Sequence, residues 1–118
     1  MNVKELAQRI DAQLYLGTGS GDSQLAHIYA ADTMSDLIAH AASDTLLVTS
    51  LCNNQLIRVA ELMDVPGICL VSESCQPSAE LLSRASTAGT AILVSKLGLE
   101  ETCARLDASL GGLTVTRA

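Results

Sequence analysis

Three tripeptides, each closing a short apolar run, recur at a spacing of 23 residues: Leu47-Val48-Thr49, Leu70-Val71-Ser72 and Leu93-Val94-Ser95. Between these runs the apolar residues follow the period of a helix, so each repeat reads as a strand, a short loop and a helix. Leucine-rich repeats have a similar period, but their Leu-x-x-Leu-x-Leu-x-x-Asn pattern does not occur here. The repeat therefore indicates adjacent βα units.

Adjacent βα units favour parallel strands that are joined by right-handed crossovers. The strands are expected near residues 46–49, 68–71 and 91–94, and they are apolar on both faces. Strands of that kind need helices on both sides of the sheet. We therefore predict an α/β fold with a mainly parallel sheet built from repeated βα units and with helices on both faces.

The flanking segments have weaker patterns. Asn2 and Glu5 have capping-box spacing at the start of a short helix, and Thr33 and Asp36 have it at the start of another. Asn53 or Asn54 is placed to cap the helix after the first repeated strand, and Pro77 is expected near the first position of the next helix. The remaining expected elements are strands at 12–16 and 25–30, which are compatible with a hairpin around the Gly-rich turn 17–23, and either a fourth strand copy or a frayed tail at 114–117.

Composition excludes several classes of function. The 118 residues are 48% apolar and 17% charged, which is typical of one globular domain, expected here to span residues 1–118. The net charge of −6 and the absence of Trp and Phe disfavour nucleic acid as a partner. No apolar run is long enough to cross a membrane and no targeting segment is visible, so we expect a cytoplasmic protein without a membrane partner.

The four cysteines show no metal-binding or redox spacing. Cys52, Cys69, Cys75 and Cys103 include no Cys-x-x-Cys pair. Cys69 falls in an apolar strand and Cys103 on the apolar face of a helix, where cysteine behaves as a small hydrophobic residue. We therefore expect reduced thiols and no metal ion.

No catalytic set is recognisable. The run Gly17 to Asp22 lacks the Lys of a Walker loop and the third Gly of a dinucleotide fingerprint, so it is interpreted as a turn. His27 and His40 have no evident catalytic partner. Asp32 and Asp36 are spaced to share a cation, but both are expected in the first turn of a helix, where capping is the simpler role. We predict no enzyme activity and no cofactor.

The loops after the repeated strands are the best candidate site. In a parallel sheet these loops lie at one edge, beside the positive amino ends of the following helices. A small anionic metabolite or nucleotide is the expected ligand. The alternative is that the same residues only cap helices and form turns. The candidate ligand-binding residues are Thr49, Ser50, Asn53, Asn54, Ser72, Ser95 and Lys96.

The stretch from Tyr29 to Leu37, followed by Leu47-Val48-Thr49, Val59-Ala60 and Gly67-Ile68, resembles the DRTGG domain family. The resemblance covers nearly the whole chain, and Asp32, Ser35 and Asp36 are its structural motif. It implies a fold similar to the N-terminal domain of HPr kinase/phosphorylase and of MurF, and a role as a stand-alone regulator of the kind associated with hydrogenase systems. The kinase activity of HPr kinase is not implied, because its phosphate-binding loop has no counterpart here.

Two functional hypotheses follow. The first is a non-catalytic regulatory module that senses a small metabolite or nucleotide and acts on a partner protein or as a homodimer. The second is a dimerising protein-interaction module with no ligand of its own. The helix at 33–42, with Met34, Ile38 and Ala41 on one stripe, is the expected dimer surface.

Overall fold

A six-stranded sheet forms the centre of the computed structural model, which describes residues 2–16, 24–51, 53–71, 77–109 and 114–117. The strand order is β1-β5-β4-β3-β2-β6, and every neighbouring pair is parallel except β1 and β5. This confirms the expected mainly parallel sheet. The strands are β1 (Gln13–Tyr15), β2 (His27–Ala30), β3 (Thr45–Thr49), β4 (Gly67–Val71), β5 (Ala91–Ser95) and β6 (Thr114–Arg117).

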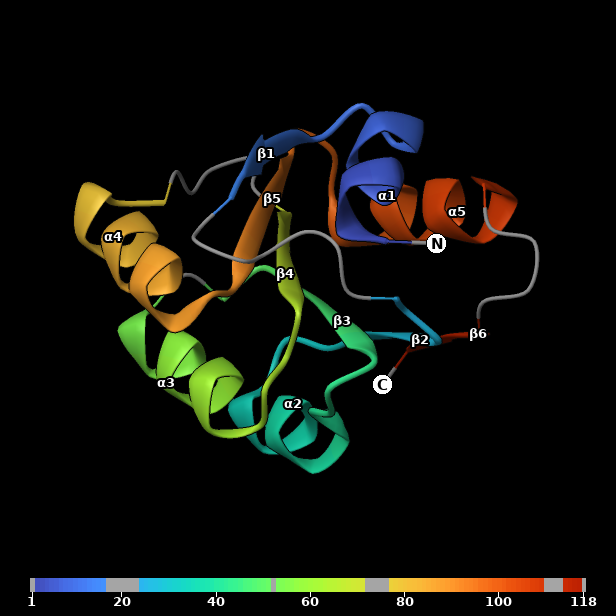
Figure 1. Cartoon of the computed structure of the whole chain (residues 1–118). Helices are drawn as coiled ribbons and strands as arrows, with labels where there is room; N and C mark the ends of the chain where they lie inside the picture. The colour runs from blue at the N-terminus through green and yellow to red at the C-terminus, as the bar shows by residue number, and fades with distance from the viewer. Residues whose placement is uncertain (1, 17–23, 52, 72–76, 110–113, 118) are drawn as a thin grey trace.

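Helices cover both faces of this sheet, as expected. From β2 to β5 the chain moves in one direction across the sheet, and right-handed crossovers place the three connecting helices on one face. After β5 the chain returns past β2 to β6, so the connecting α5 lies on the other face together with α1 (Figure 1). The helices are α1 (Val3–Arg9), α2 (Met34–His40), α3 (Asn54–Leu62), α4 (Ala79–Ala88) and α5 (Leu99–Ser109).

Side chains of successive strand residues pack alternately into two separate hydrophobic cores. Every residue of β3, β4 and β5 is buried. Leu46 and Val48 pack with α1 and α5 on one face, whereas Leu47 packs with α2, α3 and α4 on the other. The two-residue side-chain period of a strand accounts for this division.

The 23-residue repeat locates the strands but does not set their register. Leu46 pairs with Gly67, 21 residues later, and Gly67 pairs with Ala91, 24 residues later. The second offset differs from 23 by one residue, and a shift of one residue moves a side chain to the other face. Leu47 and Leu70 therefore lie in one core and Leu93 in the other.

Two details differ from the expectations for the flanking segments, and one alternative left open for residues 114–117 is resolved. No hairpin joins β1 to β2: β1 pairs with β5 at one edge of the sheet, and β2 lies between β3 and β6 near the other. Residues 114–117 form a strand rather than a frayed tail, because they pair with the amide and carbonyl groups of β2. Pro77 precedes Ser78, which is the N-cap of α4, so Pro77 lies just outside the helix. The turn at 17–23 lies outside the described residues.

Helices α1, α3 and α4 end in the same way. Each is followed by a residue with positive φ: Asp11 at 55°, Asp64 at 55° and Gly89 at 76°. In α3 the next amide, that of Val65, donates to the carbonyl oxygen of Ala60 at 2.9 Å, and the equivalent bonds in α1 and α4 have the same length. This is the Schellman motif, whose left-handed position favours Gly. Two of the three positions therefore carry a strained Asp.

The described cysteines are both buried and reduced. Cys69 on β4 and Cys103 on α5 belong to the core between the sheet and α1 and α5. Desolvation, with a smaller contribution from Cys103, raises the pKa of the Cys69 thiol to about 12. Cys69 is therefore a core residue and not a reactive thiol. Cys52 and Cys75 lie outside the described residues.

We predict that Asp64→Gly raises the free energy of unfolding by about 0.5–1 kcal/mol. Glycine removes the strain at φ 55° and also removes a negative charge from the carboxyl end of α3. Together these two gains in free energy exceed the cost of ordering the more flexible glycine backbone. Urea denaturation measures the change. The matched control, Gly89→Ala, is expected to lower the same quantity by about 1 kcal/mol. A destabilised Asp64→Gly variant would contradict the strain argument.

We also predict that Cys69 makes the fold weaker at alkaline pH. In the unfolded chain this thiol ionises near pH 9, whereas in the folded chain it keeps its proton up to about pH 12. Stability is therefore complete below pH 9 and falls as the pH rises above it, by up to about 1.4 kcal/mol per pH unit. Cys69→Ala is expected to have a shallower decline between pH 8.5 and 10.5 in urea denaturation. Parallel curves for the two proteins would refute this.

Candidate functional site

The carboxyl ends of the parallel strands meet at one edge of the sheet, which we call the carboxyl edge. The loops that follow β2, β3 and β5 begin there. Six of the seven candidate ligand-binding residues lie in described parts of these loops or at their borders, and Ser72 lies outside the described residues. The structure therefore places the candidates at the expected edge, and their individual contacts decide what each can do.

Thr49 and Asn53 satisfy the backbone of the β3–α3 loop. Thr49 is fully buried, and its Oγ1 accepts a hydrogen bond from the amide of Leu51 at 3.1 Å. Asn53 is the N-cap of α3, since its Oδ1 accepts from the amide of Leu56 at 3.0 Å. Both side chains are used by the chain itself, as the capping interpretation expects.

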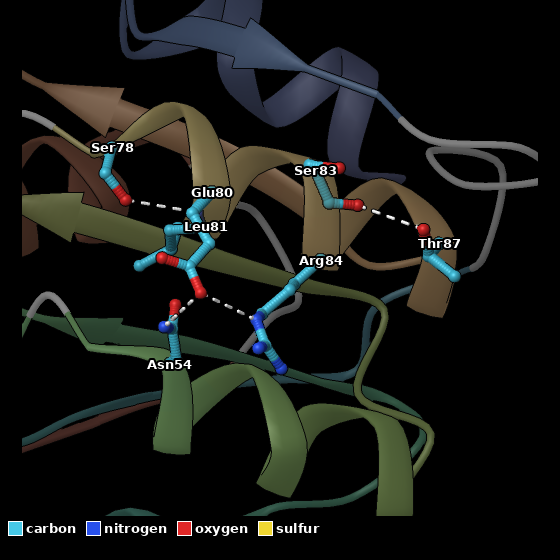
Figure 2. Close-up of polar contacts among 7 residues, drawn as sticks. All are labelled: Asn54, Ser78, Glu80, Leu81, Ser83, Arg84 and Thr87. Atoms are coloured by element: carbon cyan, nitrogen blue, oxygen red, sulfur yellow. Dashed lines mark hydrogen bonds and ion pairs between the residues drawn. The ribbon is translucent and has the colours of Figure 1, made fainter.

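Asn54 turns away from the loop and toward α4. Its Nδ2 donates to Oε1 of Glu80 at 3.3 Å, and the same oxygen accepts from Nε of Arg84 at 3.4 Å (Figure 2). Asn54 therefore ties the start of α3 to the start of α4. Glu80 and Arg84 also form an ion pair within α4, with both side chains more than half exposed.

Asp32 joins two loops at the carboxyl edge. Its Oδ1 accepts from the hydroxyl of Ser50 at 2.6 Å and from the amide of Ser50 at 3.1 Å. The expectation that Asp32 belongs to the first turn of a helix was wrong, because it precedes Thr33, the N-cap of α2. Its carboxylate is needed to bridge β2 and β3 instead. Because this carboxylate also repels anions, the corner between β2 and β3 is a poor place for an anionic ligand.

Ser95 closes a small ring of hydrogen bonds with α5. Its Oγ lies 2.9 Å from Oγ1 of Thr102, and it accepts from the amide of Leu97 at 3.3 Å. Thr102 in turn contacts the carbonyl oxygen of Leu97 at 3.5 Å. Both hydroxyls are almost completely buried, so they hold the β5–α5 loop against α5. A ligand at this loop meets its backbone and its exposed side chains.

Thr49 and Ser95 face opposite sides of the sheet. Thr49 pairs with Leu70, and Leu70 pairs with Val94, which places Thr49 on the side of α2, α3 and α4. Ser95 is one residue beyond Val94 and therefore lies on the side of α1 and α5. The carboxyl edge thus has two distinct corners, and the structure does not bring these two hydroxyls together.

A cleft of about 490 Å³ lies at the β5 corner, between the α1–β1 turn and α5. Its lining includes two basic side chains, Lys96 and Arg105, and one acidic side chain, that of Asp11. Lys96 and Arg105 are both exposed, and the structure gives neither of them an ion pair or a hydrogen bond within the described ranges. The cleft is locally cationic in a chain whose net charge is −6. The strand-end pattern indicated Lys96, but Arg105 comes from the second turn of α5 and has no signal in the loop sequences.

Asp36 takes part in the N-terminal cap of α2 together with Thr33. The Thr33 hydroxyl donates to Oδ2 of Asp36 at 2.7 Å and accepts from its amide at 3.4 Å. His40, at the end of α2, donates from Nδ1 to the carbonyl oxygen of Asp36 and stacks on Tyr29 with the ring centroids 3.8 Å apart. Burial and the Asp36 charge raise the pKa of Tyr29. Ser35 is exposed in the first turn of the helix.

The described residues contain neither a metal-binding cluster nor a membrane-spanning helix. No group of three or more His, Cys, Asp or Glu residues among them is arranged to hold a metal ion. No described helix is long and apolar enough to span a membrane.

Comparison with known proteins shows the fold. No protein-family model and no curated protein matches the chain. Among solved structures, the chain is similar to the CBS and DRTGG domains of the regulatory region of Clostridium perfringens pyrophosphatase, a structure in complex with the activator diadenosine tetraphosphate. The TM-score is 0.68 at 11% identity, over 92% of this chain and 46% of that one. This chain therefore spans about half the length of that structure and shares the fold of a regulatory region.

We predict that the Ser95–Thr102 pair is energetically coupled. Ser95→Ala or Thr102→Val alone leaves a buried hydroxyl short of a partner and is expected to lower the free energy of unfolding by about 1–3 kcal/mol. The double variant is expected to lose less than the sum of the two single losses, because no orphaned hydroxyl remains. Denaturant unfolding of the four proteins measures the coupling. Additive losses would show that the two hydroxyls act independently.

Proposed function

We propose that this chain is a non-catalytic regulatory module that binds a small anionic metabolite or nucleotide in the cleft at the β5 corner. The observation that carries the proposal is the presence at one cleft of an acidic protein of two basic side chains, Lys96 and Arg105, that form no ion pair with any residue the structure describes. A multiply charged anion is the ligand that such a pair attracts. The position at the carboxyl end of a parallel strand is also where ligands bind in α/β sheets.

The choice of a nucleotide is supported by the structural comparison. The similar regulatory region is activated by diadenosine tetraphosphate, which is an adenine nucleotide with several phosphates. The resemblance of residues 29–37 to DRTGG domains points to the same type of module, here as a single domain over residues 1–118. The module is proposed to act on a partner protein in the cytoplasm, or through its own dimer.

The six described candidate residues have different roles in the proposed site. Lys96 contacts the ligand together with Arg105, and Ser95 fixes the loop that carries Lys96. Thr49, Ser50, Asn53 and Asn54 hold the neighbouring loops in place through the bonds described above. No catalytic step is proposed, since the two histidines lie outside the residues that line the cleft.

The test is calorimetric titration of the full chain with ATP, AMP, diadenosine tetraphosphate and inorganic phosphate. Lys96→Gln and Arg105→Gln are each expected to weaken the binding of the tightest of these at least tenfold. Lys4→Gln removes the same charge from the first turn of α1, away from the cleft, and is expected to bind as the unchanged protein does. Equal affinities for all four proteins would place the site elsewhere, and no binding by any compound would contradict the proposal.

Self-association without a ligand is the second candidate function. Three apolar side chains on the α2 and α3 side of the molecule are largely exposed: Leu62 by 76%, Ile38 by 48% and Met63 by 44%. Apolar groups of this size on a surface favour contact with another protein surface. The α2 stripe expected from the sequence is incomplete, because Ala41 is buried and Met34 packs against the core.

A further inference from the structure

The outer side of α3 and α4 carries a groove of about 760 Å³. We call it the α3/α4 groove, and Figure 2 shows side chains along α4 together with Asn54 at the start of α3. It lies on the face of the sheet opposite to the proposed ligand cleft. The residues that line it are Asn54, Gln55, Ile57, Arg58, Glu61, Leu62, Ser83, Arg84 and Thr87.

The shape of this groove is fixed before any partner binds. Glu80 holds both Asn54 of α3 and Arg84 of α4, so the two helices are connected at their amino ends (Figure 2). On the α4 wall, the Thr87 hydroxyl donates to the carbonyl oxygen of Ser83 at 3.1 Å. That hydroxyl is therefore already satisfied. A preformed groove loses little conformational entropy when a partner enters it.

Leu62 gives this surface its apolar anchor. Its side chain is 76% exposed at the carboxyl end of α3. By contrast, Leu56 of α3 and Leu81 of α4 face the sheet and are buried. Leu62 lines the same groove that a neighbouring molecule would fill. An exposed side chain and a groove on the same surface suit a symmetric dimer, in which each copy inserts its side chain into the groove of the other.

The charges of the groove also fit a second copy of this chain. Among the lining residues Arg58 is balanced by Glu61, and Arg84 is balanced by Glu80, which lies beside the groove, so this surface has no net charge although the chain carries −6. Two copies of an acidic protein repel each other least where their facing surfaces are neutral. Neither Arg58 nor Glu61 has an ion pair or hydrogen bond among the residues described, so both are available to a partner.

The last six residues of α3 have an order that is nearly symmetric about one point. The point lies between Val59 and Ala60. On each side of it a small apolar residue is followed by a charged residue and then by a large apolar one, and the two charges, Arg58 and Glu61, have opposite sign. When two copies of α3 pack antiparallel across a two-fold axis at that point, Arg58 faces Glu61 of the partner subunit. The exposed Leu62 then enters the groove beside the partner subunit's Ile57, which is largely buried and lines the groove. Each favourable contact is then made twice.

We infer that the α3/α4 groove binds a second copy of this chain, with the two α3 helices antiparallel. This inference rests on the second candidate function and assigns its surface. It moves the interface from the α2 stripe to α3 and α4. It does not require the ligand cleft, which lies across the sheet, so the two proposals can fail separately.

The test is sedimentation velocity of the full chain between 1 and about 300 μM, a range that includes weak dimers. The unchanged protein is expected to be dimeric at the upper end. R58E makes the row of charges on α3 wholly acidic and E61R makes it wholly basic, so each variant alone is expected to dimerise at least tenfold more weakly. An equimolar mixture of R58E and E61R is expected to form a heterodimer, and the double variant R58E/E61R is expected to dimerise as the unchanged protein does.

Controls separate this surface from others. Ile38→Ser removes the exposed apolar residue of α2 and is expected to leave the dimer unchanged, whereas Leu62→Ser is expected to weaken it. All four substituted positions are exposed, and far-ultraviolet circular dichroism verifies folding. A monomer at every concentration would overturn the inference. So would charge-reversal variants that dimerise normally or fail to associate when mixed.

Discussion

Burial of the central strands on both faces is the constraint from which the rest of the structure follows. Every residue of β3, β4 and β5 is inaccessible to water, so both faces of the sheet must be covered by helices. Right-handed crossovers that proceed in one direction cover only one face. The chain therefore has to reverse direction once, and it does so after β5. That reversal puts α5 beside α1, places β6 next to β2, and leaves the ligand cleft and the α3/α4 groove on opposite faces.

Features set by neighbouring residues could be predicted from the sequence. The three repeated strands were located to within one residue at each end, and Asn2, Thr33 and Asn53 cap the helices that they were expected to cap. The hydrophobic period and the capping geometry that carry this information extend over only a few residues. Pairing between distant segments has no such signal. The antiparallel pairing of β1 with β5 and the one-residue difference between the β4–β5 register and the 23-residue repeat depend on loop lengths and packing. The repeat alone does not predict either of them.

The candidate site was predictable in position and less so in detail. A parallel sheet places its strand ends at one edge, so the loops were located correctly. The side chains there have alternative partners in the chain itself. Asp32 reaches Ser50 across 18 residues, and Ser95 reaches Thr102 inside the core rather than the loop surface. Arg105 reaches the cleft only because α5 packs beside α1. The short side chains of serine, threonine and aspartate readily form hydrogen bonds to nearby backbone groups. The sequence of such a loop is therefore equally compatible with helix capping and with ligand binding.

In the proposed regulatory module the ligand has to favour one arrangement over another, and β5 is a strand that packs against both helical layers. Val94 faces the core under α4, and Ser95 faces α5 beside the cleft. A displacement of this strand end therefore acts on both layers through one backbone. A ligand can shift the dimer equilibrium only by the ratio of its affinities for monomer and dimer, and dimerisation must change ligand affinity by the corresponding factor. Because the cleft and the α3/α4 groove have no described lining residue in common, any such coupling has to pass through the sheet, where the Ser95–Thr102 hydrogen bond ties the end of β5 to α5.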